Sequence, residues 1–192
     1  MGKLVVSEFV SVDGVMEDPG GSEKSKRGGW VLQFNRGDEG DRFKLEELMS
    51  AEALLLGRKT YEGFADAWPS RLDDVGFADK MNRMPKYVVS STLRDPKWSN
   101  TTVIDRDLVE SIRKLKQNTD GELLVNGSCQ LVHALIENSL VDEVRLMVFP
   151  IVLGMGKRLF GDSPHAWPFR LLESRAVGQE GVLIVRYEPK PM

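Results

Sequence analysis

Residues 122–136 (ELLVNGSCQLVHALI) constrain the fold of this 192-residue chain more tightly than any other stretch. The apolar run at residues 123–125 is typical of a short buried strand, and Asn-Gly-Ser at residues 126–128 interrupts it. Apolar residues then recur at helical spacing at Leu131, Val132, Leu135 and Ile136. The pattern predicts a strand, a tight turn and a helix in direct succession.

Such a turn can bind an anion. The first backbone N–H groups of a helix lack intrahelical partners, and they lie at the positive end of the helix dipole. Gly127 would allow a phosphate to approach the backbone closely, and Ser128 is either a helix cap or a phosphate donor. Since a Gly-Ser turn before a helix is most often structural, this stretch alone leaves both interpretations open.

A second copy of the pattern occurs at residues 51–61. The apolar strand at residues 51–56 leads directly into Gly57, Arg58, Lys59 and Thr60, which open a helix. Arg58 and Lys59 place full positive charge where helix N–H groups already favour anions, and Thr60 can cap or donate. The alternative is a solvated basic helix cap.

The strand expected at residues 87–89 ends in a further candidate anion site. Ser90, Ser91 and Thr92 follow it directly, and Arg94 lies close by. A turn rich in hydroxyl groups is the alternative interpretation.

The remaining pattern predicts an α/β fold. Strands that alternate with helices imply a mostly parallel sheet with helices on both faces, and the last two strands read as an antiparallel hairpin. Residues 30–49 suggest a helix interrupted or preceded by a turn at 37–40, and residues 65–79 a loop or short helix. The other expected strands are 3–12, 101–104, 142–149, 169–177 and 182–187, and a further helix is expected at 108–116.

Two loops attract attention. Residues 17–29 form a long, turn-rich segment that could act as a flap over a site. Residues 154–159 (GMGKRL) resemble a nucleotide-binding loop, but they lack the third glycine and an evident strand-to-helix setting, so that interpretation is rejected.

Composition limits the classes of function. The length fits a single domain, residues 1–192, and the net charge of −3 disfavours a nucleic-acid surface. The single Cys129 excludes an intrachain disulfide, and His133 and His165 lack partners at metal-ligand spacing, so no metal is expected. No apolar run is long enough to span a membrane, and no signal-type segment begins the chain, which favours a cytoplasmic protein without membrane contact.

Five motifs together resemble a known family. They are Val10-Ser11-Val12-Asp13-Gly14, Leu55-Leu56-Gly57-Arg58-Lys59-Thr60-Tyr61, Val88-Val89-Ser90-Ser91, Val125-Asn126-Gly127-Ser128, and a segment from Leu140 to Phe160 that contains Pro150-Ile151-Val152-Leu153-Gly154-Met155-Gly156-Lys157-Arg158. Over essentially its whole length, the chain resembles the dihydrofolate reductase-like family. The likeness is to the reductase domain of the bifunctional riboflavin-biosynthesis deaminase-reductase and its stand-alone bacterial relatives. The resemblance implies a three-layer α/β/α fold with a mostly parallel central sheet finished by a C-terminal antiparallel hairpin.

The resemblance also implies a cofactor, NADPH, bound across the carboxyl ends of the strands. It assigns the adenosine-side phosphates to Gly57, Arg58, Lys59 and Thr60. The 2′-phosphate falls to Ser90 and Ser91 with Arg94, and the pyrophosphate to Gly127, Ser128, Cys129 and Gln130. The backbone near Phe9 and the side chain of Met16 would border the nicotinamide.

The substrate end is less well defined. Riboflavin reductases commonly carry an acidic residue where this chain has Asn126, which puts the ribosylaminopyrimidine substrate in doubt; Asp13 and Asn126 are the candidate substrate contacts. Asp41 is a candidate for the carboxylate that assists protonation in folate reductases, although its acidic surroundings could equally be a solvated loop.

We therefore expect an NADPH-dependent reductase of a small heterocycle, with 5-amino-6-(5-phosphoribosylamino)uracil reduction as the family-level expectation. A dihydrofolate or pterin reductase-like activity and a non-catalytic NADP(H)-binding protein are the alternatives. A homodimer is expected, because the strand at 142–149 and the apolar residues 151–153 suggest more apolar sheet surface than one helix layer covers.

Overall fold

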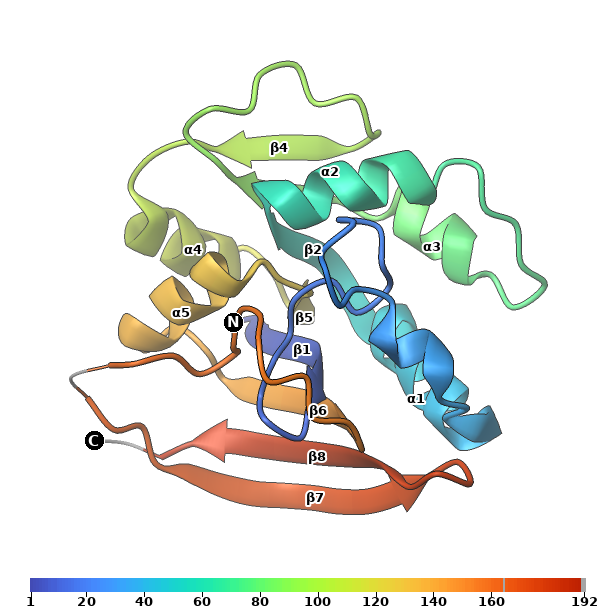
Figure 1. The fold of residues 1–192 in the computed structure, drawn as a ribbon. Helices are drawn as coiled ribbons and strands as arrows, with labels where there is room; N and C mark the ends of the chain where they lie inside the picture. The colour runs from blue at the N-terminus through green and yellow to red at the C-terminus, as the bar shows by residue number, and fades with distance from the viewer. Residues whose placement is uncertain (164, 191–192) are drawn as a thin grey trace.

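One eight-stranded sheet runs through the protein, in the strand order β4-β3-β2-β5-β1-β6-β8-β7 (Figure 1). The computed structural model describes residues 1–163 and 165–190. All pairs from β4 to β6 are parallel, whereas β8 pairs antiparallel with both β6 and β7. The strands are β1 (Lys3–Ser11), β2 (Ala51–Gly57), β3 (Lys86–Val89), β4 (Thr101–Ile104), β5 (Glu122–Val125), β6 (Glu143–Phe149), β7 (Phe169–Val177) and β8 (Val182–Pro189). The predicted parallel sheet with a C-terminal antiparallel hairpin is confirmed.

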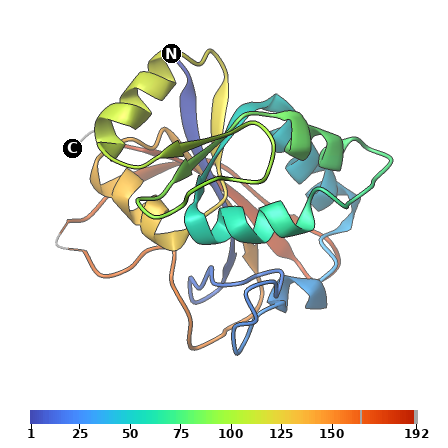
Figure 2. The ribbon, with the colours of Figure 1, turned by 90° about the horizontal axis from the view of Figure 1, so that it is seen from above.

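Helices cover both faces of the sheet, which confirms the three-layer arrangement (Figure 2). On one face, α1 (Gly37–Ser50), α2 (Arg58–Ala67) and α3 (Phe77–Arg83) pack through Leu48, Tyr61 and Met81. On the other face, α4 (Leu108–Gln117) and α5 (Cys129–Glu137) pack through Ile112, Leu135 and neighbouring apolar residues. The central strands read as continuous apolar runs because they are buried on both sides.

The glycines near residue 40 begin a helix, so the expected turn at residues 37–40 is wrong. A short 3₁₀ helix η1 (Trp30–Gln33) comes first, and α1 starts at Gly37. At Gly40 an added Cβ would lie 2.8 Å from Arg36 Cβ and 3.2 Å from Met147 Cε. Glycine therefore permits a close approach of the helix to β6, a tertiary requirement that reads as a turn in the sequence alone.

The register between β1 and its neighbours opens a gap at the carboxyl edge of the sheet. β1 pairs with β5 only as far as Val6 opposite Val125, but with β6 as far as Ser11 opposite Phe149. Beyond Val6, no strand in the described part of the chain consequently pairs with the β5-facing edge of β1. In open α/β sheets, ligands bind outside the carboxyl ends of strands, so this gap places a candidate site. No helix among the described residues is long and apolar enough to cross a membrane.

Candidate functional site

The carboxyl ends of four neighbouring parallel strands bring the candidate anion-binding turns together. Because β4, β3, β2 and β5 are adjacent and parallel, their following segments lie side by side along one edge of the sheet. These segments are residues 105–107, 90–94, 57–60 and 126–130. The three turns predicted separately from the sequence therefore form one continuous row, with residues 105–107 added.

The two helix-start turns contact each other directly. The Gly57 N–H donates to Gly127 O at 3.1 Å. A side chain at Gly57 would collide with Ser128, and a Cβ at Gly127 would lie 2.8 Å from Thr60 Oγ1. Gly127 also has a φ of +84°, which disfavours any other residue. Both glycines are thus required by the close packing of the turns.

A cleft of about 430 Å³ continues this row at the ends of β3 and β4. Arg58 reaches across its mouth and donates to Thr92 Oγ1 at 2.6 Å, while its Nε pairs with Glu62. Arg106 provides a second guanidinium. The lining residues are Arg58, Val89, Ser90, Ser91, Thr92, Ile104, Asp105, Arg106, Asp107 and Leu108. Two cations with several hydroxyl groups suit a ligand that carries a phosphate.

Of the residues predicted from the sequence to hold the 2′-phosphate, Ser90 and Ser91 line this cleft and Arg94 does not. The Ser90 hydroxyl oxygen accepts the N–H groups of Thr92 and Leu93, so it shapes the turn, while Ser91 is exposed in the cleft. Arg94 donates to the carbonyls of Leu93 and Ser91 and does not line the cleft. Arg106, which the sequence analysis did not select, stands where Arg94 was expected.

At the start of α5, the side chains of Cys129 and Gln130 have different surroundings. The Cys129 thiol donates to Arg158 O at 3.1 Å, and burial raises the pKa of this thiol. His133 Nε2 lies 2.7 Å from Leu159 O, so this face of α5 is fixed to the segment that follows β6. Gln130 is exposed. The backbone of residues 127–130 is therefore the feature that remains for an anion.

The gap beside β1 is closed partly by Asn126. Its Nδ2 donates to Ser7 O at 2.9 Å, so the side chain bridges the end of β5 and the unpaired edge of β1. Phe9 lies on that same edge, and its ring meets Phe149 edge-to-face with centroids 5.5 Å apart. Met16 is buried in the core on the α4 and α5 side. Phe9 and Asn126 thus come together at the gap, whereas Met16 packs inward.

The two candidate aspartates have other partners. The carboxylate of Asp13 accepts the Ser11 hydroxyl at 2.7 Å and the N–H groups of Leu153 and Gly154. These hydrogen bonds, with the Ser11 hydroxyl first, lower the pKa of Asp13 to about 2. Asp41 is exposed and pairs with Arg36 at 2.6 Å. Asp13 therefore connects the loop that follows β1 to the loop that follows β6, and Asp41 is exposed to solvent.

Acidic and basic side chains that the sequence analysis passed over lie under α1. Glu47 is 4% exposed and accepts the Ser7 hydroxyl at 2.7 Å. Lys44 pairs with Glu47, donates to Ser7 Oγ at 2.7 Å, and lies 5.2 Å above the centroid of the Phe9 ring. The available signal was the polar Ser7-Glu8 pair inside an otherwise apolar strand.

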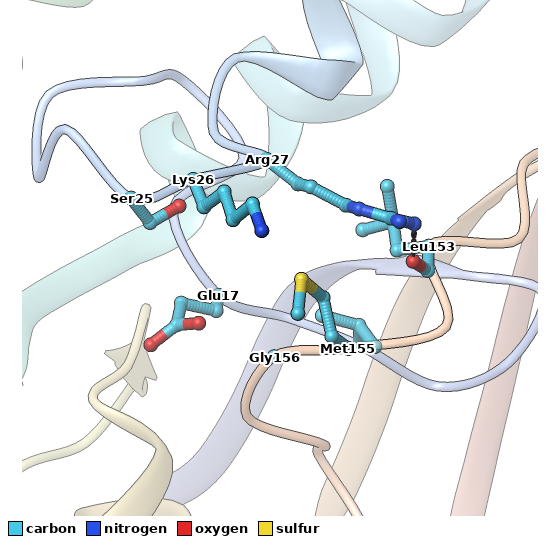
Figure 3. A pocket seen from close by; sticks show the side chains of 8 residues that line it. Glu17, Ser25, Lys26, Arg27, Leu153, Met155 and Gly156 are labelled. Atoms are coloured by element: carbon cyan, nitrogen blue, oxygen red, sulfur yellow. Dashed lines mark hydrogen bonds between the residues drawn. The ribbon is translucent and has the colours of Figure 1, made fainter.

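The loop at residues 17–29 packs on the segment after β6, as Figure 3 shows. Asp18 orders this loop by accepting the N–H groups of Glu23 and Ser25. Arg27 donates to Leu153 O, and Lys157 pairs with Glu17 at 3.1 Å. A cavity of about 210 Å³ remains between the two segments. The expected flap over the site stays a prediction.

Within residues 1–163 and 165–190, no group of three or more His, Cys, Asp or Glu side chains is arranged to hold a metal ion.

The sheet topology defines a dihydrofolate reductase-like fold. The chain belongs to the RibD C-terminal domain family, whose model matches residues 2–183. This confirms the resemblance inferred from the sequence motifs.

Individual relatives agree with this membership. The uncharacterized protein YyaP of Bacillus subtilis (strain 168) is 25% identical over 186 residues, which make up 95% of this chain and 93% of that protein. A crystal structure of a candidate riboflavin biosynthesis protein from Shewanella sp. PV-4 superposes with a TM-score of 0.78 at 21% identity, covering 98% of this chain and 99% of that one. Dihydrofolate reductase from Enterococcus faecalis, in a complex with NADP(H), gives a TM-score of 0.61 at 14% identity and covers 98% and 97% of the two chains. At these identities, the two structures demonstrate the fold alone.

Proposed function

We propose that this protein is an NADPH-dependent reductase that transfers hydride to a small heterocyclic substrate. The observation that carries the proposal is the direct contact between the two helix-start turns, Gly57–Thr60 and Asn126–Gln130, with a cleft beside them that presents the guanidinium groups of Arg58 and Arg106. Two helix-start turns and a separate cleft with two guanidinium groups lie in one row, as an extended ligand with several phosphates would require. A single capped turn would require none of this arrangement.

The residues along this edge fit the dinucleotide in chemical character. The cleft with Arg58 and Arg106 would hold the 2′-phosphate, and the exposed Ser91 hydroxyl would add a donor. The first N–H groups of α2 and α5 would hold the phosphates between the two nucleosides. The unpaired edge of β1 near Phe9 would receive the nicotinamide. When bound, the cofactor supplies the hydride, and the chain binds, orients and excludes water.

The substrate class rests on family membership. The RibD C-terminal domain match supports a role in riboflavin biosynthesis, with a ribosylaminopyrimidine as the family-level substrate. Asn126 departs from the acidic residue common in those reductases, and its amide is held by Ser7 O. A pterin is the alternative heterocycle, since the dihydrofolate reductase likeness covers nearly the whole chain. The Asn126 contact favours a second candidate function, an NADP(H)-binding protein without turnover.

Two measurements test this function in sequence. Binding of NADPH is first followed by its fluorescence, and loss of its near-ultraviolet absorbance is then followed with aminopyrimidine and pterin substrates. Saturable NADPH binding with turnover of one heterocycle supports the reductase. Tight binding without turnover of any heterocycle supports the non-catalytic alternative, and the absence of NADPH binding contradicts both.

A further inference from the structure

Glu8 is an acidic residue in β1 whose side chain is buried against one face of the sheet. Side chains alternate along a strand, and Val6 and Val10 both belong to the core on the α4 and α5 side, so Glu8 points to that face of β1. Only 9% of Glu8 is exposed. Its Oε1 atom is buried and has no hydrogen-bond partner within the part of the chain that the structure describes. Such an orphaned acceptor costs free energy unless it carries a proton or meets a ligand.

The position of Glu8 coincides with the gap at the carboxyl edge. It lies two residues beyond Val6, the last β1 residue paired with β5. The backbone of Gly127 is close enough to lower the pKa of its carboxyl group, and a charge on Glu8 would raise the pKa of the Cys129 thiol at the start of α5. Glu8 therefore stands beside the turn and the unpaired strand edge that the proposed function assigns to the cofactor.

Burial keeps Glu8 protonated at neutral pH. Burial is the largest influence and raises the pKa of Glu8 to about 8, with a smaller contribution from Glu47. Lys44 and the Gly127 N–H act in the opposite direction. On the same face of the sheet, the Cys129 thiol lies on α5. The Lys44 and Glu47 pair of α1 acts from the opposite face, where it contacts Ser7. Asp13, in contrast, is ionised, because its pKa is about 2.

A hydride reduction requires an acid as well as a hydride. Addition of hydride to the carbon of a C=N or C=O bond moves the π electron pair onto nitrogen or oxygen, and that atom must take up a proton. The reduced nicotinamide is oxidised and becomes a cation. A neutral carboxylic acid beside the unpaired edge of β1, where the proposed function places the nicotinamide, can supply the proton and is left as a carboxylate near the new positive charge.

We infer that Glu8 is this acid: it gives its proton to the substrate nitrogen or oxygen in the reduction, and its carboxylate stabilises the oxidised cofactor. The inference rests on the proposed function. Glu8 is reprotonated from solvent once the oxidised cofactor leaves, so protons balance over one turnover.

This role predicts proton release on cofactor binding without any substrate. NADP⁺ carries a positive nicotinamide ring, which would lower the pKa of a neighbouring Glu8; NADPH has the same phosphates but a neutral ring. For a downward shift of about two pKa units, binding of NADP⁺ at pH 7 releases roughly 0.8 proton more than binding of NADPH. The comparison between the two cofactors cancels proton exchange at the phosphates.

The experiment is isothermal titration calorimetry with NADP⁺ and with NADPH, each in two buffers of different ionisation enthalpy. The wild type and Glu8→Gln are compared with Glu137→Gln, which removes an exposed carboxylate at the end of α5. The wild type and Glu137→Gln should release the extra proton with NADP⁺, and Glu8→Gln should not. Equal release with both cofactors in the wild type, or persistence of the difference in Glu8→Gln, would overturn the inference.

If Glu8→Gln does not fold, the same titrations of the wild type at pH 10 still test the inference. Glu8 is ionised at that pH before any cofactor binds, so the difference between NADP⁺ and NADPH must vanish; a difference that persists overturns the inference. The outcomes also separate the two proposals. Failure of both cofactors to bind removes the proposed function together with the inference, whereas binding without proton release removes the inference alone.

Discussion

At the residue scale, two glycines and one serine distinguish a phosphate turn from a helix cap. Gly57 and Gly127 lie in contact because neither carries a Cβ, and the contact brings the N-termini of α2 and α5 together. Ser128 is the N-cap residue of α5, yet its side chain makes no capping hydrogen bond. The Ser128 hydroxyl is therefore not used as a cap, and it remains able to donate to a ligand together with the first N–H groups of α5.

Replacement of Gly127 with Asp tests the phosphate turn. If residues 127–130 hold pyrophosphate, the new carboxylate meets like charge in a partly desolvated cleft, and NADPH binding should be lost in protein that still folds. The positive φ and the contact with Thr60 also predict a lower melting temperature. NADPH affinity and melting temperature are measured on the same sample.

Ser128→Ala is the matched control for that replacement. It should weaken NADPH binding by only ~1 kcal/mol, because one hydrogen bond is lost while the backbone donors remain. Near-native affinity in folded Gly127→Asp protein would remove this turn from the cofactor site.

The cleft at Arg58 and Arg106 predicts a preference for the phosphorylated cofactor. Two guanidinium groups and the Ser91 hydroxyl suit a dianionic 2′-phosphate, so NADPH should bind more tightly than NADH by ~1–3 kcal/mol. Dissociation constants of both cofactors, measured by fluorescence, give this difference. In Arg106→Gln it should shrink, and equal constants in the wild type would contradict the assignment of the cleft.

Glu8 predicts a specific pH dependence of stability. Its pKa is about 8 in the folded protein, against an ordinary value near 4.5, so between these values the folded state holds a proton that the unfolded state has lost. The contribution of Glu8 to the unfolding free energy therefore falls as the pH rises from about 4.5 to about 8. Urea denaturation should show Glu8→Gln gaining stability relative to the wild type between pH 5 and pH 8. A constant difference between the two proteins would show that Glu8 is already ionised at pH 5.

At the scale of whole elements, periodicity predicted the strands and helices well where apolar residues pack against one another. β3, β4 and β5 were predicted to within a residue or two. β5 is an apolar run because it is buried on both faces, whereas β4 lies at the edge of the sheet and is only partly buried. α1 was harder, since much of its contact with the sheet is polar. Glu47 meets Ser7 and Arg145 there, and no spacing rule pairs residues so distant in sequence.

The residues of the candidate site also fall into those that local sequence signals predict and those that depend on tertiary neighbours. Turns that follow a strand were found from the sequence because strand, glycine and helix start are all local signals. Arg106 and Glu8 were missed because their importance depends on neighbours: Arg106 on the parallel pairing of β4 with β3, and Glu8 on the early end of β5. Asp13 was chosen as a substrate contact from its motif, and only the structure shows the loop amides that occupy it.

Lys86 is an element-scale prediction of stability. Its Nζ, fully buried under α3, donates to the carbonyls of Asn82, Met84 and Ser99 and lies 4.3 Å from the Trp98 ring centroid. Lys86→Met should cost about 1–3 kcal/mol of unfolding free energy, because these carbonyls lose their donor. Urea denaturation measures the loss. Lys97→Met, at an exposed pair with Asp95 in the following loop, should leave stability nearly unchanged, and equal effects would refute a structural role for Lys86.

At the scale of the whole molecule, the sheet has two unequal edges. β4, at one end, is short, whereas β7, at the other, is a nine-residue strand for which β8 is the only partner strand within residues 1–163 and 165–190. The dimer expected from the sequence stays a prediction. Of the two segments on which it rested, β6 lies inside the sheet between β1 and β8 and is mostly buried, whereas Val152 in the segment 151–153 is exposed. Within the sheet, exposed apolar side chains are found at the opposite end, at Leu171 and Leu172 of β7 and at Leu183 of β8.

We therefore propose a homodimer formed through β7. A long edge strand with unpaired backbone groups and exposed leucines is a surface that soluble proteins usually cover, and a second copy can cover it symmetrically. Light scattering at micromolar concentration should give twice the chain mass of 21.6 kDa. Leu171→Glu should reduce the mass to that of a monomer, because Leu171 is 52% exposed and a carboxylate there would have to be desolvated in the interface.

Leu72→Glu, at a side chain already 98% exposed in the loop between α2 and α3, should leave the dimer intact. A monomeric mass for the wild type would contradict the proposal, and a dimer that persists in Leu171→Glu would move the interface away from β7.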